Sequence, residues 1–220
     1  MKGGRQIARS AHHAPSGRQT KAGQSGGWLA LAAIAAILFL GVATAAWFQT
    51  SKSQVTAGQG VGGPFRMVDQ DGRPVDQSVL RGHWSAVFFG YTFCPDICPA
   101  TLQTLGQASR RLGPSAKDFQ VVFVSVDPER DHPPQMKAYI EAQALPVRTI
   151  GLTGSTAEVA QIAKSYKVFY AKAGAGTAYS VDHSAAIYMM DPTGRFVSPL
   201  SGEMAPDKIA DEIRKAQRGG

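Results

Sequence analysis

The chain has 220 residues, with 23 Lys and Arg against 16 Asp and Glu, and hence a formal net charge of +7. Five of the basic residues lie within residues 1–27, which contain no acidic residue: Lys2, Arg5, Arg9, Arg18 and Lys21. The rest of the chain therefore carries 18 basic against 16 acidic residues and is nearly neutral. Because it has no Lys/Arg cluster of the kind that marks a nucleic-acid footprint, we expect no nucleic-acid partner.

Residues 1–27 are rich in Gly, Ser, Gln and His and predict a disordered cytoplasmic tail. Residues 28–48 follow without a charge, close to the roughly 20 residues that cross a bilayer. Trp28 and Trp47 stand at the two ends, where interfacial aromatic residues belong. These features predict a transmembrane anchor. A cleaved signal peptide is the alternative, but this apolar run exceeds the roughly 7–15 residues of such a segment.

Charge on the two sides of residues 28–48 predicts their orientation. Five positive residues precede this span and only Lys52 closely follows it, which places the N-terminus in the cytoplasm and the remainder outside. We therefore expect a single-pass protein of the cell inner membrane with a periplasmic C-terminal part. Residues 49–62 predict a Gly/Ser/Gln-rich linker, and residues 63–220 are long enough for one domain with a substantial core.

This domain is predicted to open with a small hairpin, because residues 65–68 and 74–75 flank the turn signal Asp71-Gly72. Apolar patterns and capping signals then predict, in chain order, a buried strand over 85–91, a helix over 100–112, a second buried strand over 120–126, a helix over 133–144, a short segment over 148–152, a helix from a Ser155 cap to Tyr166, an antiparallel hairpin of 185–190 and 195–198, and a last helix from about Pro206. The order implies parallel strands with right-handed crossovers. The expected fold class is α/β, a thioredoxin-like fold with an N-terminal hairpin extension and an inserted helix.

Cys94 and Cys98 are the chain's two cysteines, and they follow the predicted strand 85–91. Each precedes a proline, which favours an extended loop. Pro99 suits the first helical position, so Cys98 is expected at the N-cap, where the helix dipole would lower the pKa of its thiol. Two soft ligands with three residues between them, at the edge where open α/β sheets bind ligands, indicate metal or redox chemistry.

A histidine is the natural third ligand, and three of the chain's five lie in the domain. His83 precedes strand 85–91 and is therefore expected about 20 Å away, at the opposite edge of the sheet. His132 and His183 both fall near the edge that carries the cysteines. Topology alone does not decide which of these two histidines is the third ligand.

Three motifs, spread over about residues 65–216, carry a resemblance that separates them: Phe93-Cys94-Pro95-Asp96-Ile97-Cys98-Pro99, Ser125-Val126-Asp127-Pro128-Glu129-Arg130-Asp131, and Val181-Asp182-His183-Ser184 with Tyr188 and Asp191-Pro192-Thr193-Gly194. Together they resemble the Sco/SenC family of membrane-anchored copper proteins. The resemblance implies that Cys94, Cys98 and His183 bind one copper ion and that Asp127 supports the site. It also implies a role in assembling the binuclear copper centre of cytochrome c oxidase.

The donor chemistry agrees with copper. Two thiolates and an imidazole suit Cu(I), zinc or an iron–sulfur centre. Two cysteines cannot complete a Cys₄ cluster, and structural zinc prefers four ligands, although catalytic zinc with two Cys and one His stays open. We expect His132 to cap a helix or lie on the surface. At least one of Met189 and Met190 is expected in the core, because neighbouring strand residues face opposite sides.

The expected function is a copper chaperone that delivers copper, or reduces target thiols, for the copper-bearing subunit of cytochrome c oxidase. Other expected partners are thiol reductants or copper donor proteins. The alternative is a thiol-disulfide oxidoreductase that uses Cys94 and Cys98, although the usual redox motif has two intervening residues. A peroxiredoxin is a weaker option, since Thr92 is not three residues before Cys94. A purely structural disulfide would close too short a loop to stabilise much.

Overall fold

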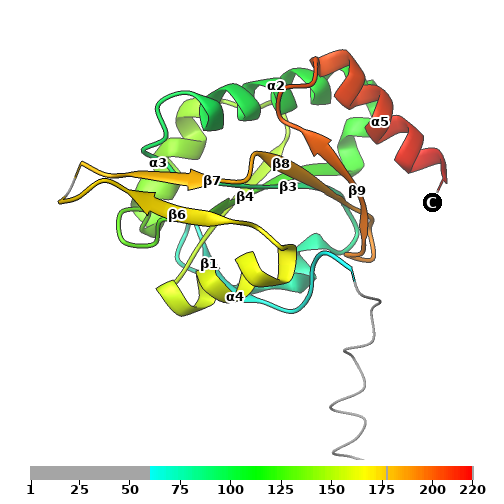
Figure 1. Cartoon of the computed structure of the whole chain (residues 1–220). Coiled ribbons are helices and arrows are strands. Elements are labelled where there is room, and N and C mark those ends of the chain that lie inside the picture. Colours follow the sequence, from blue (N-terminus) through cyan, green and yellow to red (C-terminus); the bar gives the residue numbers. More distant parts are fainter. Residues whose placement is uncertain (1–59, 177, 220) are drawn as a thin grey trace, which may run out of the picture. The chain divides into compact units, whose positions relative to one another are not determined.

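The computed structural model describes residues 60–176 and 178–219 (Figure 1). The predicted tail 1–27, the predicted anchor 28–48 and residues 49–59 of the predicted linker lie outside the described residues. Among the helices that are described, none combines the length and apolar character needed to cross a bilayer.

A seven-stranded mixed sheet forms the centre of the domain, in the order β2-β1-β5-β4-β3-β8-β9. Its strands are β1 (Arg66–Asp69), β2 (Pro74–Asp76), β3 (Trp84–Gly90), β4 (Phe119–Ser125), β5 (Arg148–Thr153), β8 (Ala186–Met190) and β9 (Phe196–Ser201). Strands β3, β4 and β5 are parallel, and the outer pairs are antiparallel. Every residue of β3 and β4 is buried, as expected for parallel strands covered on both faces.

Helices cover both faces of this sheet (Figure 1). The helices are α2 (Ile97–Leu112), α3 (Pro133–Gln143), α4 (Thr156–Tyr166) and α5 (Pro206–Gly219), with short 3₁₀ helices η1 (Gln77–Leu80) and η2 (Gly113–Asp118). Residues of α2, α3 and α5 pack with Phe88 and Phe123 in one core cluster. Residues of α4 and η1 pack with Phe89 and Val124 in the other. Alternate residues of β3 and β4 thus supply two cores.

The predicted elements are present, with shifted ends. The short segment after α3 is the strand β5, and Ser155 caps α4 through a capping box with Glu158. One prediction about the cysteine helix was wrong: α2 begins at Ile97 after an N-cap at Asp96, so Cys98 lies within its first turn instead of capping it. Proline is tolerated throughout a first helical turn, where its missing N–H leaves no intrahelical bond unmade.

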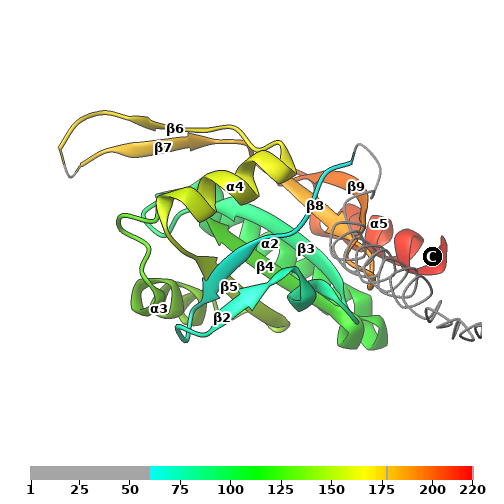
Figure 2. The same cartoon turned by 90° about the horizontal axis from the view of Figure 1, so that it is seen from below.

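The two short 3₁₀ helices were not predicted, and neither was a two-stranded hairpin of β6 (Tyr170–Ala173) and β7 (Ser180–His183). It forms its own small sheet, in which Tyr170 pairs with His183. Figures 1 and 2 both show this hairpin projecting beyond the seven-stranded sheet. Its last residue, His183, therefore reaches the main domain from a separate structural unit.

Candidate metal centre

Cys94, Cys98 and His183 meet at one place, with their ligating atoms all within 4.8 Å of one another. The Sγ atom of Cys98 lies 3.4 Å from Nε2 of His183, and the backbone N–H of Cys98 donates to Sγ of Cys94 at 3.4 Å. Nδ1 of His183 lies 3.1 Å from the carbonyl oxygen of Ser184. A carbonyl only accepts, so Nδ1 carries the proton and Nε2 keeps its lone pair toward the sulfur atoms.

Polar contacts of Asp131 fix the start of the cysteine loop. Its carboxylate accepts from the backbone N–H of Thr92 at 3.0 Å and from the Thr92 hydroxyl at 2.6 Å. It also accepts from the Ser125 hydroxyl at the end of β4, at 2.7 Å. Although these bonds favour the carboxylate, burial raises the pKa of Asp131 above its usual value. The segment that leads into Cys94 is thereby attached to the neighbouring strand.

The two thiols differ in exposure. Cys98 is completely buried, whereas Cys94 is partly exposed. Burial raises the pKa of the Cys98 thiol well above its usual value in the metal-free protein, so the expectation of a lowered pKa was wrong. Removal of the thiolate from water is the largest cause of this shift, and the neighbouring Cys94 thiol adds to it.

Aromatic rings surround the histidine. The ring of His183 meets the ring of Phe88 edge-on at 6.2 Å between centroids and the ring of Tyr91 edge-on at 6.0 Å.

Gly90, the last residue of β3, leaves room for Cys98. A Cβ atom at Gly90 would lie 2.7 Å from Sγ of Cys98 and 2.7 Å from the ring of Phe123. Only glycine fits between the end of β3 and the buried thiol without displacing it.

The structure separates the two histidines that topology left tied. His132 is exposed and is the N-cap residue of α3, and it does not belong to the cluster of Cys94, Cys98 and His183. His83 precedes β3, where its Nε2 lies 2.8 Å from Nη1 of Arg148. Met189 and Met190 are both buried, in opposite core clusters.

Asp127 also lies outside this cluster, although its side chain is fully buried. Its carboxylate accepts from Nε of Arg130 at 2.5 Å and from the hydroxyl of Tyr179 at 2.6 Å. Sequence reasoning missed Arg130 and Tyr179, as well as Asp131 and Thr92. Three of these four residues lie within or next to the motifs that drew attention to the site, but no spacing rule indicates which side chains they meet.

Exposed apolar side chains border the ligands. Phe93 and Ile97 flank the cysteines and are 57% and 54% exposed, and Phe169 is 66% exposed. Phe169 lies beside the histidine segment, because its carbonyl accepts from the N–H of Ser184 at 3.0 Å. The partly exposed ligands Cys94 and His183 therefore lie in an apolar setting.

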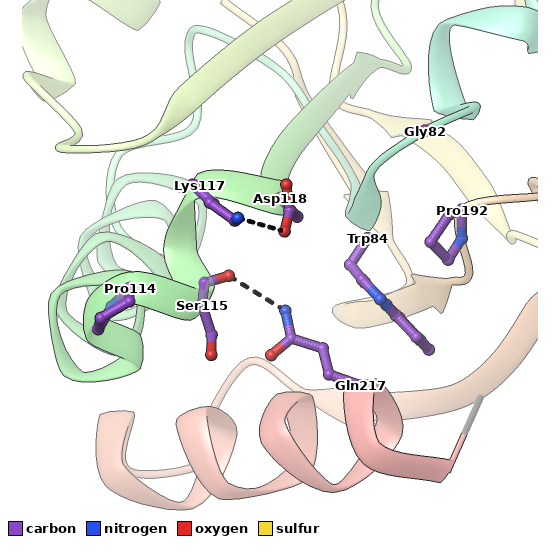
Figure 3. Close-up of a pocket in the computed structure, with 8 residues that line it drawn as sticks. All are labelled: Gly82, Trp84, Pro114, Ser115, Lys117, Asp118, Pro192 and Gln217. Carbon is purple, nitrogen blue, oxygen red and sulfur yellow. Dashed lines mark hydrogen bonds and ion pairs between the residues drawn. The ribbon is translucent and has the colours of Figure 1, made fainter.

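A separate depression lies at the amino end of β3 (Figure 3). Its lining includes Trp84, Lys117, Asp118 and Gln217. Lys117 and Asp118 face each other at 3.9 Å, and Gln217 donates to the carbonyl of Ser115 at 3.2 Å. The cysteines follow the opposite end of β3, about 20 Å away at the usual rise per residue. The depression is thus distinct from the metal centre.

The fold and the site together define a class: a thioredoxin-like α/β domain with a Cys₂His group suited to a soft metal ion. The chain belongs to the SCO1/SenC family, whose family model matches residues 53–218.

Named relatives agree with this assignment. The chain is 39% identical over 199 residues to human "Protein SCO2 homolog, mitochondrial", covering 88% of this chain and 71% of the relative. Among solved structures, ScoI of Bradyrhizobium japonicum with copper bound is 40% identical, with a TM-score of 0.64 over 70% of this chain and 98% of that one. BsSco, described as having a disulfide switch and as a member of the Sco family of cytochrome c oxidase assembly proteins, is 26% identical, with a TM-score of 0.57 over 76% and 99%.

Proposed function

We propose that this protein is a membrane-anchored copper chaperone that delivers copper for assembly of the binuclear copper centre of cytochrome c oxidase. The observation that carries the proposal is the convergence of Cys94, Cys98 and His183 within 4.8 Å in a chain of the SCO1/SenC family. The copper-bound relative and the oxidase-assembly description of another relative support the choice of metal and of pathway.

The donor set suits a metal that must be bound and then released. Two thiolates and one imidazole are soft ligands that favour Cu(I). Three protein ligands leave copper open to an incoming thiolate, so transfer to a partner can proceed by ligand exchange. The cysteines must be reduced beforehand, because a disulfide offers no thiolate.

The proposed location follows from the residues outside the described part of the chain. Residues 28–48 form the anchor, residues 1–27 a cytoplasmic tail and residues 49–62 a linker to the domain of residues 63–220. The positive charges before the anchor support an extracytoplasmic, periplasmic domain. There it would meet the copper-bearing subunit of the oxidase, together with copper donors and thiol reductants.

Thiol reduction at the target is the second candidate function. It is favoured by the proximity of the two free cysteines, which belong to the same group of ligating atoms, and by the disulfide switch of the relative BsSco. A general oxidoreductase needs no metal, whereas a copper chaperone must bind one.

Copper binding by the two redox forms tests the proposed ligands. The reduced full-length protein should bind one copper ion, and the form with Cys94 joined to Cys98 should bind none. Equal uptake by both forms would contradict the proposed thiolate ligands.

The proposed role in oxidase assembly can be tested in cells that lack the protein. They should lose copper-dependent oxidase activity, and added copper should restore at least part of it, because excess metal can load the oxidase without a chaperone. General disulfide formation, measured on an unrelated periplasmic protein, should remain normal. Broad disulfide defects with an intact oxidase would favour the oxidoreductase instead.

A further inference from the structure

Arg130 lies between the two segments that carry the proposed metal ligands. It belongs to the loop between β4 and α3, and its side chain is only 17% exposed. The carbon at the centre of its guanidinium group lies 3.7 Å from the ring centroid of Tyr179 and 4.8 Å from that of Phe93. Phe93 directly precedes Cys94, and Tyr179 directly precedes β7, which ends at His183. One planar cation thus contacts an aromatic ring from each ligand-bearing segment.

Asp127 holds this cation in place. Its buried carboxylate accepts from Nε of Arg130 at 2.5 Å and from the Tyr179 hydroxyl at 2.6 Å. Nη1 of Arg130 donates to the backbone carbonyl of Tyr179 at 3.0 Å. A buried carboxylate requires such charged and hydrogen-bonding partners. Asp127, Arg130 and Tyr179 are thus joined to one another by hydrogen bonds, and we term these three residues the hairpin clamp.

The hairpin needs an attachment of this kind. Strands β6 and β7 pair with each other and are separate from the seven-stranded sheet, and they project beyond it (Figure 2). Its other charged contact with the β4–α3 loop joins Lys172 to Glu129, and both side chains are about half exposed. An exposed ion pair of this kind contributes little. The hairpin clamp is mostly buried, so it is the stronger restraint on how β7 approaches the cysteine loop.

We infer that Arg130 is a positioning residue of the metal centre, which holds Nε2 of His183 within reach of the two sulfur atoms. The inference rests on the proposed function, since it assumes that His183 is a copper ligand. Arg130 is not one of the three residues whose ligating atoms converge. It acts through the hairpin, and its planar, forked guanidinium is needed because a lysine cannot stack on Tyr179 and hold Asp127 at the same time.

The test measures Cu(I) binding by the reduced full-length protein in competition with a chelator. Arg130→Ala should weaken binding about tenfold, since it removes charged hydrogen bonds and ring contacts that fix the ligand. Arg130→Lys should restore little of this loss. Tyr179→Phe keeps the ring beneath the guanidinium and removes one hydroxyl, so it should fold normally and weaken binding less than Arg130→Ala. Glu129→Gln, which removes the charge of the exposed pair with Lys172 and leaves every ring contact of Tyr179 in place, should leave affinity unchanged.

A double-mutant cycle separates positioning from general stability. If Arg130 acts through His183, then Arg130→Ala combined with His183→Ala should bind copper as His183→Ala alone does. X-ray absorption of copper-loaded Arg130→Ala should show less nitrogen ligation at unchanged sulfur ligation. Additive losses, or a normal nitrogen contribution in both Arg130→Ala and Tyr179→Phe, would overturn the inference.

The same measurements distinguish this inference from the proposed function. Unchanged copper binding by His183→Ala would contradict the ligand set itself, and the positioning role would fall with it. A loss in His183→Ala together with wild-type affinity in Arg130→Ala and Tyr179→Phe would overturn the hairpin clamp alone. In that case the copper site would remain as proposed.

Discussion

The Sγ atom of Cys98 and Nε2 of His183 lie 3.4 Å apart, although 85 positions separate the two residues in the chain. Cys98 lies in the first turn of α2, and His183 ends a hairpin that is not part of the main sheet. The site therefore exists only when two separately anchored segments are brought together. A metal ion bound there would join them.

Replacing His183 by Ala should weaken Cu(I) binding at least tenfold, because loss of a direct ligand costs no less than loss of a group that merely orients one, about 10–100-fold. The Cys94–Cys98 disulfide should still form, since the imidazole is not part of the thiol couple. Competition with a chelator measures the first effect, and thiol counting after oxidation measures the second. His132→Ala is the matched control and should bind copper normally. A loss in His132→Ala with none in His183→Ala would show that the wrong histidine was assigned.

Gly90→Ala should displace the thiol of Cys98 and so disturb the metal centre. The added Cβ would lie 2.7 Å from Sγ of Cys98 and 2.7 Å from Phe123, so we expect a stability loss of about 1–3 kcal/mol and roughly tenfold weaker copper binding. Denaturant unfolding and chelator competition measure these two effects.

Gly151→Ala provides a control with the same kind of steric conflict. Its Cβ would clash with the side chains of Ile140 and Met136, whereas the Cβ at Gly90 would clash with a ligand atom. A similar loss of stability with wild-type copper affinity is expected. If both variants lost affinity equally, the effect of Gly90→Ala would be one of general destabilisation.

Copper affinity should increase with pH. Burial raises the pKa of the Cys98 thiol, so this group is protonated at neutral pH in the metal-free protein, and copper must displace its proton. The logarithm of the Cu(I) association constant should therefore rise by about one per pH unit for each thiol proton released, between about pH 6 and 8. Titrations in buffers of different ionisation enthalpy would count the protons. An association constant that does not vary with pH would mean that the thiolate already exists before the metal arrives.

The orientation of the chain can be tested without reference to copper. The positive residues before residue 28 should keep the N-terminus in the cytoplasm. A reporter that works only in the cytoplasm should be active when fused before Trp28 and inactive when fused after Gly220. Activity of the C-terminal fusion would exclude the periplasmic location.

Much of the fold could be predicted because its signals are local. The apolar runs of β3 and β4 and the Ser155 cap are visible in a few consecutive residues, and the structure confirms them. The hairpin β6–β7 was missed because its short strands, of four residues each, are not strongly apolar. A strand that is half exposed and pairs only with its own neighbour leaves a weak pattern.

The position of the metal centre could be predicted from the sequence only in part. The cysteines could be placed at the correct edge of the sheet, but topology could not separate His132 from His183, and that choice came from family resemblance. The two histidines are separated in space: His132 is the exposed N-cap residue of α3, whereas the hairpin places His183 next to Cys98. The pKa of Cys98 was predicted in the wrong direction because burial depends on contacts distant in sequence, such as those with the core around Phe88 and Phe123.

The unequal exposure of the two thiols limits the side from which a partner can reach the metal centre. Cys98 is sealed by the core, while Cys94 and His183 are partly exposed and bordered by Phe93, Ile97 and Phe169. Under the proposed function, a copper donor and a copper acceptor would both have to reach the metal from the side of Cys94 and His183. Two partners could not contact these ligands at once, so loading and unloading would alternate, and the protein would part from one partner before it meets the next.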